Sequence, residues 1–81
     1  MEQALKQGVN YQITKHIGKI SENRTNWKEL NLISYNGFPA KYDLRKWTKD
    51  EDGNPRMGRG ITLNTEETVI LRDLLNKIDL D

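Results

Sequence analysis

Four short segments in which polar and apolar residues alternate, separated by turn signals, constrain the fold of this chain more than any other feature. Such alternation is typical of β-strands, because successive side chains of a strand point to opposite faces. The segments are Tyr11–Ser21, Trp27–Asn36, Ala40–Trp47 and Met57–Leu63. Asn36-Gly37 favours a hairpin turn, and the charged 49–55 loop ends the third segment. We therefore expect a curved, four-stranded antiparallel sheet.

The first segment is the least regular of the four. Strict alternation places one set of residues on a single side: Tyr11, Ile13, Lys15, Ile17 and Lys19. Gly18 and the return of an apolar residue at Ile20 on the other side indicate a bend or a β-bulge in a long strand.

One helix is expected after the fourth strand. Asn64 is a good N-cap, and Glu67 three residues later completes the pattern of a capping box. Apolar residues of this segment fall within an arc of about 140°: Ile70, Leu71, Leu74, Leu75 and Ile78. We expect this arc to cover the sheet face that carries Leu30, Leu32, Tyr42 and Leu44. Val69 lies off the arc and is either exposed or in contact with a second subunit. The predicted class is α+β with the order ββββα.

Length and composition set the remaining bounds. With 81 residues the chain has room for one domain, predicted over residues 11–81, after a polar, flexible N-terminus at 1–10. So small a core is marginal alone, which favours oligomerisation. Cysteine is absent, which excludes disulfides and thiolate metal sites. No apolar run approaches the roughly 20 residues that span a bilayer. We expect a cytoplasmic protein, associated with the nucleoid if bacterial.

The sheet face opposite the helix is expected to be open, basic and aromatic. Residues 11–49 hold eight Lys or Arg against three acids. Cations that follow phosphates, together with aromatic rings that stack on bases, are what a single strand of nucleic acid requires. The candidate nucleic-acid contacts are Lys15, Lys19, Trp27, Lys28, Asn31, Phe38, Lys41, Arg45, Trp47, Arg56 and Arg59.

Other interpretations of these residues stay open. Trp47 is equally compatible with a place in the core, and Trp27 with the edge of the core. Lys41 and Arg45 are compatible with solvated strand residues, with Asp43 between them as a salt-bridge partner.

Catalysis has no support in the sequence. His16 is the one histidine and lacks a nucleophile to activate. The acidic 50–55 loop departs from a calcium loop, with proline at the sixth position and Ile61 at the twelfth. We expect no catalytic residue, cofactor, metal or small-molecule substrate.

Two linked motifs resemble a known family. They are the strand Tyr42-Asp43-Leu44-Arg45-Lys46-Trp47 and the segment Gly58-Arg59-Gly60-Ile61-Thr62-Leu63 that leads into Asn64-Thr65-Glu66-Glu67. Together they resemble the positive-cofactor-four family of transcriptional coactivators and, with Trp27–Leu32, its bacterial YdbC-like branch. The likeness covers roughly Tyr11 to Leu75.

The resemblance implies a ββββα protomer in a two-fold dimer that binds single-stranded DNA on its concave sheet faces. It also implies that Arg45 and Trp47 contact the DNA. The Ser-rich, acidic regulatory tail of the eukaryotic coactivators is absent from this sequence, so activator binding is not implied.

The sequence thus predicts a non-enzymatic homodimer that binds single-stranded DNA with little sequence preference, in transcription regulation, replication or repair. RNA is an open alternative, because stacking and phosphate contacts do not sense the 2′-hydroxyl. The rival from another class is a protein-interaction module that uses the aromatic sheet face.

Overall fold

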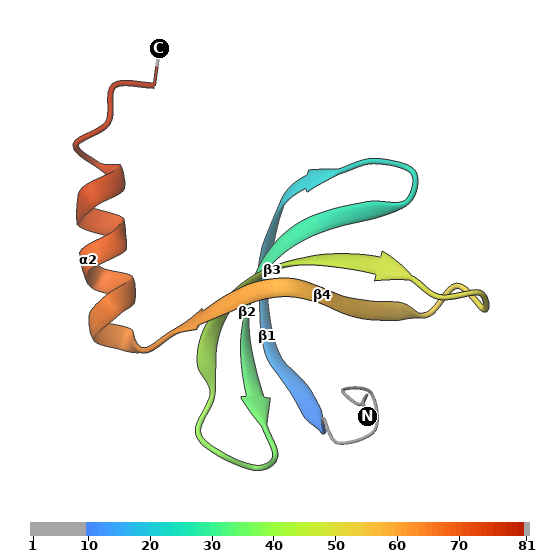
Figure 1. Cartoon of the computed structure of the whole chain (residues 1–81). Coiled ribbons are helices and arrows are strands. Elements are labelled where there is room, and N and C mark those ends of the chain that lie inside the picture. Colours follow the sequence, from blue (N-terminus) through green and yellow to red (C-terminus); the bar gives the residue numbers. More distant parts are fainter. Residues whose placement is uncertain (1–9, 81) are drawn as a thin grey trace.

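A computed structural model describes residues 10–80 of the chain as a four-stranded sheet followed by a helix. The elements are β1 Tyr11–Glu22, β2 Asn26–Tyr35, β3 Lys41–Lys49, β4 Pro55–Leu63 and α2 Thr65–Leu75 (Figure 1). The strands pair antiparallel in the order β1-β2-β3-β4, which confirms the predicted ββββα order. Except for Asn10, the N-terminus expected to be flexible lies outside the described residues.

The β2–β3 hairpin turns where the sequence predicts. Asn36 and Gly37 have φ angles of 53° and 80°, and the Phe38 N–H donates to the Tyr35 carbonyl at 2.9 Å. Two consecutive positive φ angles suit the right-handed twist of the flanking strands. The register beyond the turn is regular, with Trp27 opposite Trp47.

β1 is more irregular than the sequence suggested. Three register shifts interrupt its pairing with β2, one of them beside Gly18. Each shift adds a residue on the β1 side and increases the local bend. Lys15 consequently pairs with Leu32, whereas Lys19 pairs with Glu29. The expectation that both lysines share a face is therefore wrong.

Ring contacts show which way the sheet curves. Tyr11 pairs with Tyr35 at one end of β2, while Trp47 pairs with Trp27 at the other end. An extended strand would separate those ends by roughly 26 Å, yet the Tyr11 and Trp47 ring centroids are 6.0 Å apart. The strands therefore curl over the face that carries these rings. We call it the concave face, and we call the face of Lys28, Leu44 and Lys46 the convex face.

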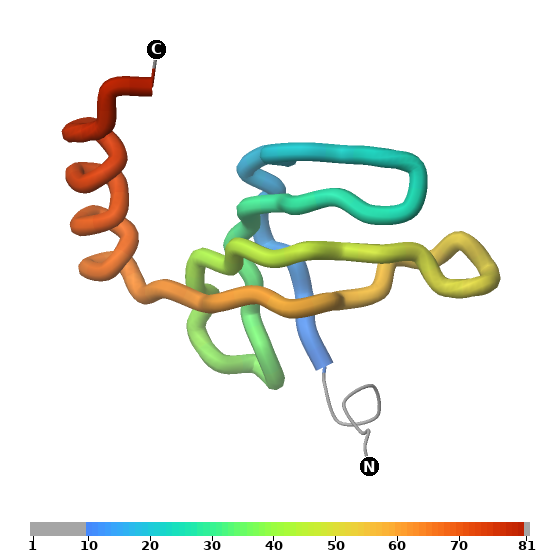
Figure 2. Tube along the Cα trace, turned by 45° about the horizontal axis from the view of Figure 1, so that its top comes forward, coloured from blue at the N-terminus to red at the C-terminus, as the bar shows by residue number. Residues whose placement is uncertain are grey.

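The core lies inside this curve and corrects two expectations. Its buried residues are Ile33, Trp47, Asn31 and Asp43, all on the face expected to be open. The helix expected to cover the leucine face instead has no buried residue and contacts only β3 and β4. In Figures 1 and 2 α2 runs beside the sheet.

The helix begins as predicted but ends early. The Glu67 N–H donates to Asn64 Oδ1 at 2.7 Å, and the Asn64 N–H donates to Glu67 Oε1 at 2.9 Å. This reciprocal pair confirms the capping box. α2 ends at Leu75, so Ile78 of the predicted arc lies beyond it. No helix within residues 10–80 combines the length and apolarity needed to cross a membrane.

Candidate nucleic-acid interface

A polar network occupies the middle of the concave face. Arg45 donates from Nε to Asp43 Oδ1 and from Nη2 to Asp43 Oδ2, both at 2.7 Å. Tyr35 donates its hydroxyl to Asp43 Oδ2 at 2.6 Å. The hydrogen bond to Asp43 raises the pKa of Arg45, although burial opposes this effect. Burial, followed by the hydrogen bond to Asp43, raises the pKa of Tyr35. The buried carboxylate thus holds the guanidinium inside the fold.

The two tryptophans stack on each other rather than standing open. Their ring centroids are 6.5 Å apart with an interplanar angle of 10°. Trp47 is 1% exposed, so the structure places it in the core and not on an open face. Trp27 is half-buried and donates from Nε1 to Glu29 Oε1 at 3.1 Å, and the Lys19 Nζ lies 5.6 Å from its ring centroid. Trp27 and Lys19 therefore mark the accessible rim of the concave face.

Asn31 is enclosed in the same core. Neither its amide oxygen nor its amide nitrogen has a hydrogen-bond partner, and the same holds for Trp47 Nε1 among the described residues. Asn31 is fully buried, so it offers no surface to a ligand in this conformation.

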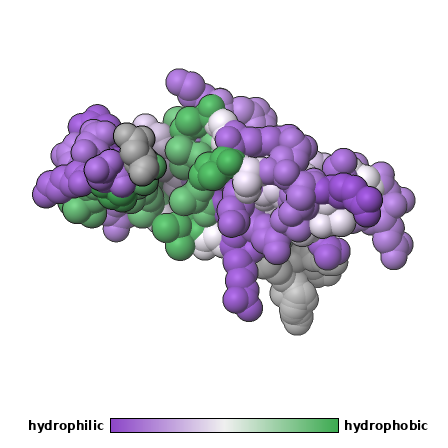
Figure 3. Space-filling view, turned by 90° about the horizontal axis from the view of Figure 1, so that it is seen from above, coloured by the Kyte–Doolittle hydropathy of each residue, from purple (hydrophilic) through white to green (hydrophobic). Residues whose placement is uncertain are grey.

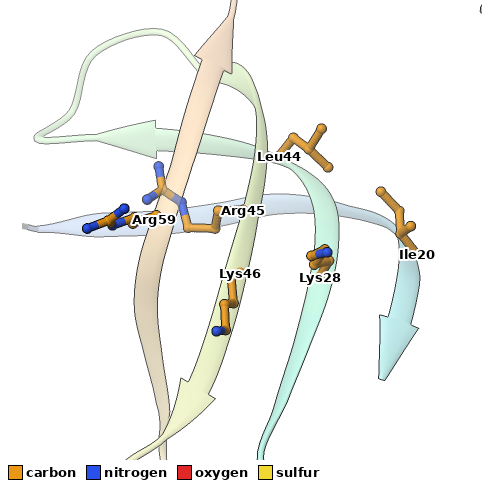
Figure 4. Close-up of a pocket in the computed structure, with 6 residues that line it drawn as sticks. All are labelled: Ile20, Lys28, Leu44, Arg45, Lys46 and Arg59. Atoms are coloured by element: carbon orange, nitrogen blue, oxygen red, sulfur yellow. The ribbon is translucent and has the colours of Figure 1, made fainter. Parts of the chain in front are cut away.

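Three cations that form no ion pair within residues 10–80 meet on the convex face instead. Lys28, Lys46 and Arg59 line a pocket of about 340 Å³. They come from three neighbouring strands (Figure 4), and Ile20 and Leu44 supply its apolar part. Arg45 of β3 also lines this pocket. No acid lines this pocket, and no salt bridge joins the three cations to an acid of residues 10–80.

Lys28 and Lys46 are directly opposite each other across β2 and β3. Like charges in such a pair repel and destabilise a sheet, and Arg59 adds a third positive charge. We call these residues the basic pocket. Its electrostatics favour an anion with several negative groups. Lys46 was not among the predicted contacts, because the prediction favoured the opposite face. The alternation along β3 assigns Lys46 and Arg45 to opposite faces, and this was the signal in the sequence that could have identified Lys46.

The remaining predicted residues lie on the surface at some distance along the strands from this pocket and do not line it. Lys15 is exposed on the convex face, and Arg56 is exposed near the start of β4. Phe38 is 67% exposed at the β2–β3 hairpin tip. Phe38 and Lys41 line a second pocket of about 410 Å³ beside the start of α2. The structure therefore joins Lys28 with Arg59 but separates both from Trp47.

Comparison with known proteins yields one family and one relative. The model of the family described as Transcriptional Coactivator p15 (PC4) matches residues 22–74. An uncharacterized protein of Treponema pallidum (strain Nichols) is 45% identical over 73 residues, which cover 89% of this chain and 82% of the relative. The family match runs from the end of β1 through most of α2, so it includes every strand that forms the basic pocket except most of β1.

Proposed function

Because this chain belongs to the Transcriptional Coactivator p15 (PC4) family, we propose that it binds single-stranded DNA, with little sequence preference, through the basic pocket. The observation that carries this proposal is the Lys28–Lys46 pair with Arg59 beside it, none of which forms an ion pair with an acid of residues 10–80. Phosphates would neutralise these charges and release the counterions of the DNA. Ile20 and Leu44 would pack against the apolar faces of bases.

The other predicted contacts extend the proposed surface. Exposed cations at Lys15, Lys41 and Arg56 would bind further phosphates. Phe38 and Trp27 have accessible ring surface on which a base can stack, a contact worth about 1–3 kcal/mol. Asn31, Arg45 and Trp47 would support the sheet from the buried side.

We also propose that the functional unit is a homodimer. Large apolar residues remain exposed on α2 and on the convex face: Ile61, Ile70, Leu74 and Leu75. Figure 3 shows hydrophobic residues gathered at the helix and the adjoining part of the sheet, whereas hydrophilic residues cover the far end. A second copy of the chain would bury this surface and compensate for the small core.

The proposed binding serves transcription regulation, replication or repair, at the nucleoid of a bacterial cell, and RNA is the alternative ligand. The rival protein-interaction function relied on an open aromatic sheet face. In the structure the centre of that face is buried, and Trp27 at its rim keeps accessible ring surface.

A titration tests the proposal. Labelled oligothymidine and a duplex of equal length are titrated at two or more salt concentrations. We expect tighter binding of the single strand and a steep decrease in affinity with salt. Lys28→Ala, Lys46→Ala and Arg59→Ala should each lower the salt slope by about 0.7, the value per phosphate contact of a single strand.

Lys77→Ala removes one positive charge away from the pocket, beyond the end of α2, and is the matched control. Equal slopes for all four variants and the wild type would contradict the basic pocket as the site. Equal affinity for single strand and duplex would contradict the ligand.

A further inference from the structure

We infer that Arg45 is a positioning residue: it holds the β4 bulge that carries Arg59 of the basic pocket. This inference rests on the proposed binding of single-stranded DNA. It adds a structural role to the DNA contact that the family resemblance implies for Arg45, and its basis is the hydrogen bonding and packing around the guanidinium.

The guanidinium of Arg45 is already occupied within the fold. Its Nε and Nη2 donate to the two oxygens of Asp43, Nη2 also donates to the Tyr35 hydroxyl at 3.1 Å, and Nη1 donates to the Gly58 carbonyl at 2.9 Å. All three nitrogens are therefore engaged, and the side chain is 14% exposed. Moving the guanidinium away from these partners would leave a fully buried carboxylate without its cation, which is strongly unfavourable.

The Gly58 carbonyl belongs to a β-bulge. Arg45 pairs with Gly60 and Trp47 pairs with Met57, so Gly58 and Arg59 together lie opposite the single residue Lys46. A bulge disrupts the ladder locally and leaves a backbone group in need of another partner. Arg45 Nη1 supplies that partner, so the guanidinium links β3 to the bulge.

Two glycines leave the space that this link requires. A Cβ on Gly60 would lie 2.1 Å from the Arg45 Cβ, and a Cβ on Gly58 would lie 2.9 Å from the Lys46 carbonyl oxygen. Glycine at both positions lets β4 approach β3 closely enough for Arg45 to reach across. The two glycines of the Gly58-Arg59-Gly60 segment therefore leave the room that the Arg45 side chain occupies between β3 and β4.

The chain of contacts then runs from the core to the surface. Asp43 and Tyr35 orient Arg45, Arg45 fixes the Gly58 carbonyl, and the next residue along the chain is Arg59. Arg59 lines the pocket together with Lys28 and Lys46. Without this support the bulge would shift, and Arg59 would lose its place beside the two lysines.

Two isosteric or charge-conserving variants separate positioning from direct contact. Arg45→Lys keeps the positive charge but cannot form the bidentate and bulge bonds together. Asp43→Asn removes a negative charge and keeps the side-chain shape. If Arg45 positions Arg59, both variants weaken oligothymidine binding. If Arg45 contributes only its positive charge to binding, Arg45→Lys binds nearly as wild type and Asp43→Asn binds as tightly or more tightly, which would overturn the inference.

A double-mutant cycle distinguishes positioning from general damage. Arg59→Ala should weaken binding in the wild type. In the Arg45→Lys background the fold-change in affinity that it causes should be smaller by a factor of about 3 or more, because the effects of coupled residues are not additive. Full additivity would refute the coupling. Arg24→Lys, in the exposed turn before β2, is the matched control for an arginine-to-lysine change and should leave binding unchanged. Thermal melts establish that each variant is folded at the assay temperature.

A readout without DNA keeps the inference separate from the proposed function. In Arg45→Lys, amide hydrogen exchange should accelerate in residues 56–61 while the β1–β2 turn exchanges as in the wild type. Unchanged exchange at 56–61 would refute the support of the bulge, whatever the ligand. If the wild-type protein fails to bind single-stranded DNA but the exchange result holds, the proposed function fails and the support of the bulge stands.

Discussion

At the scale of single residues, Trp47 can be tested for a place in the core against a role in base stacking. It is buried between Tyr11 and Trp27. We expect Trp47→Ala to lower the free energy of unfolding by about 3–5 kcal/mol, the usual cost of deleting a large buried aromatic side chain. The half-buried Trp27, changed to alanine, should cost less. Denaturant unfolding of both variants measures the difference; equal small losses would show that Trp47 is not a core residue.

Tyr35 gives the same network a pH dependence. Its pKa is raised by burial and by Asp43, so the native state holds the phenolic proton more tightly than the unfolded chain. This contribution is present below the unfolded pKa of about 10 and is lost as the pH rises through that value toward the higher folded pKa. We expect the melting temperature to decrease between pH 9 and 11, and to decrease less in Tyr35→Phe. Parallel curves for the two proteins would contradict this.

At the scale of elements, two strand glycines that look alike in sequence have opposite surroundings. A Cβ on Gly60 would collide with Arg45, whereas a Cβ on Gly18 would have no atom within 4 Å. We expect Gly60→Ala to be strongly destabilising, because β3 and β4 must separate or Arg45 must leave Asp43. Gly18→Ala should be neutral or stabilising by up to about 1 kcal/mol, since it reduces the entropy of the unfolded chain. Thermal melts compare the pair, and similar losses in both would contradict the close packing at Gly60.

At the scale of the whole molecule, the exposed apolar surface predicts self-association. Ile61 is 56% exposed and Ile70 57% exposed, on a sheet face and a helix that stand side by side. We expect the protein to sediment as a dimer at micromolar concentration. Ile70→Glu should shift it toward monomer, because a carboxylate would have to be buried at the interface.

Arg72→Glu introduces the same side chain on the polar side of α2, and is the matched control for this change. It should leave the dimer intact. A wild-type protein that sediments as a monomer would contradict the proposed assembly, and equal behaviour of the two variants would place the interface away from Ile70.

Much of this fold follows from the sequence because the signals are local. Alternation defines the strands, Asn36-Gly37 forms the turn with two positive φ angles, and Asn64 with Glu67 forms the capping box. The paired motifs around Arg45 and Gly60 predicted the family that the comparison confirmed. Each of these features depends on residues that are close together in the chain.

Only the tertiary structure decided which strand face becomes the core. A period of two sorts side chains into two sets but does not determine which way the sheet curves. The leucine set is the more apolar, which is why the prediction placed the core there. The three bulges of β1 curl the sheet the other way, so Trp47 is buried together with Ile33, Asn31 and Asp43. The same curvature leaves Lys28, Lys46 and Arg59 together on the outside, since their proximity arises from strand register and from the β4 bulge.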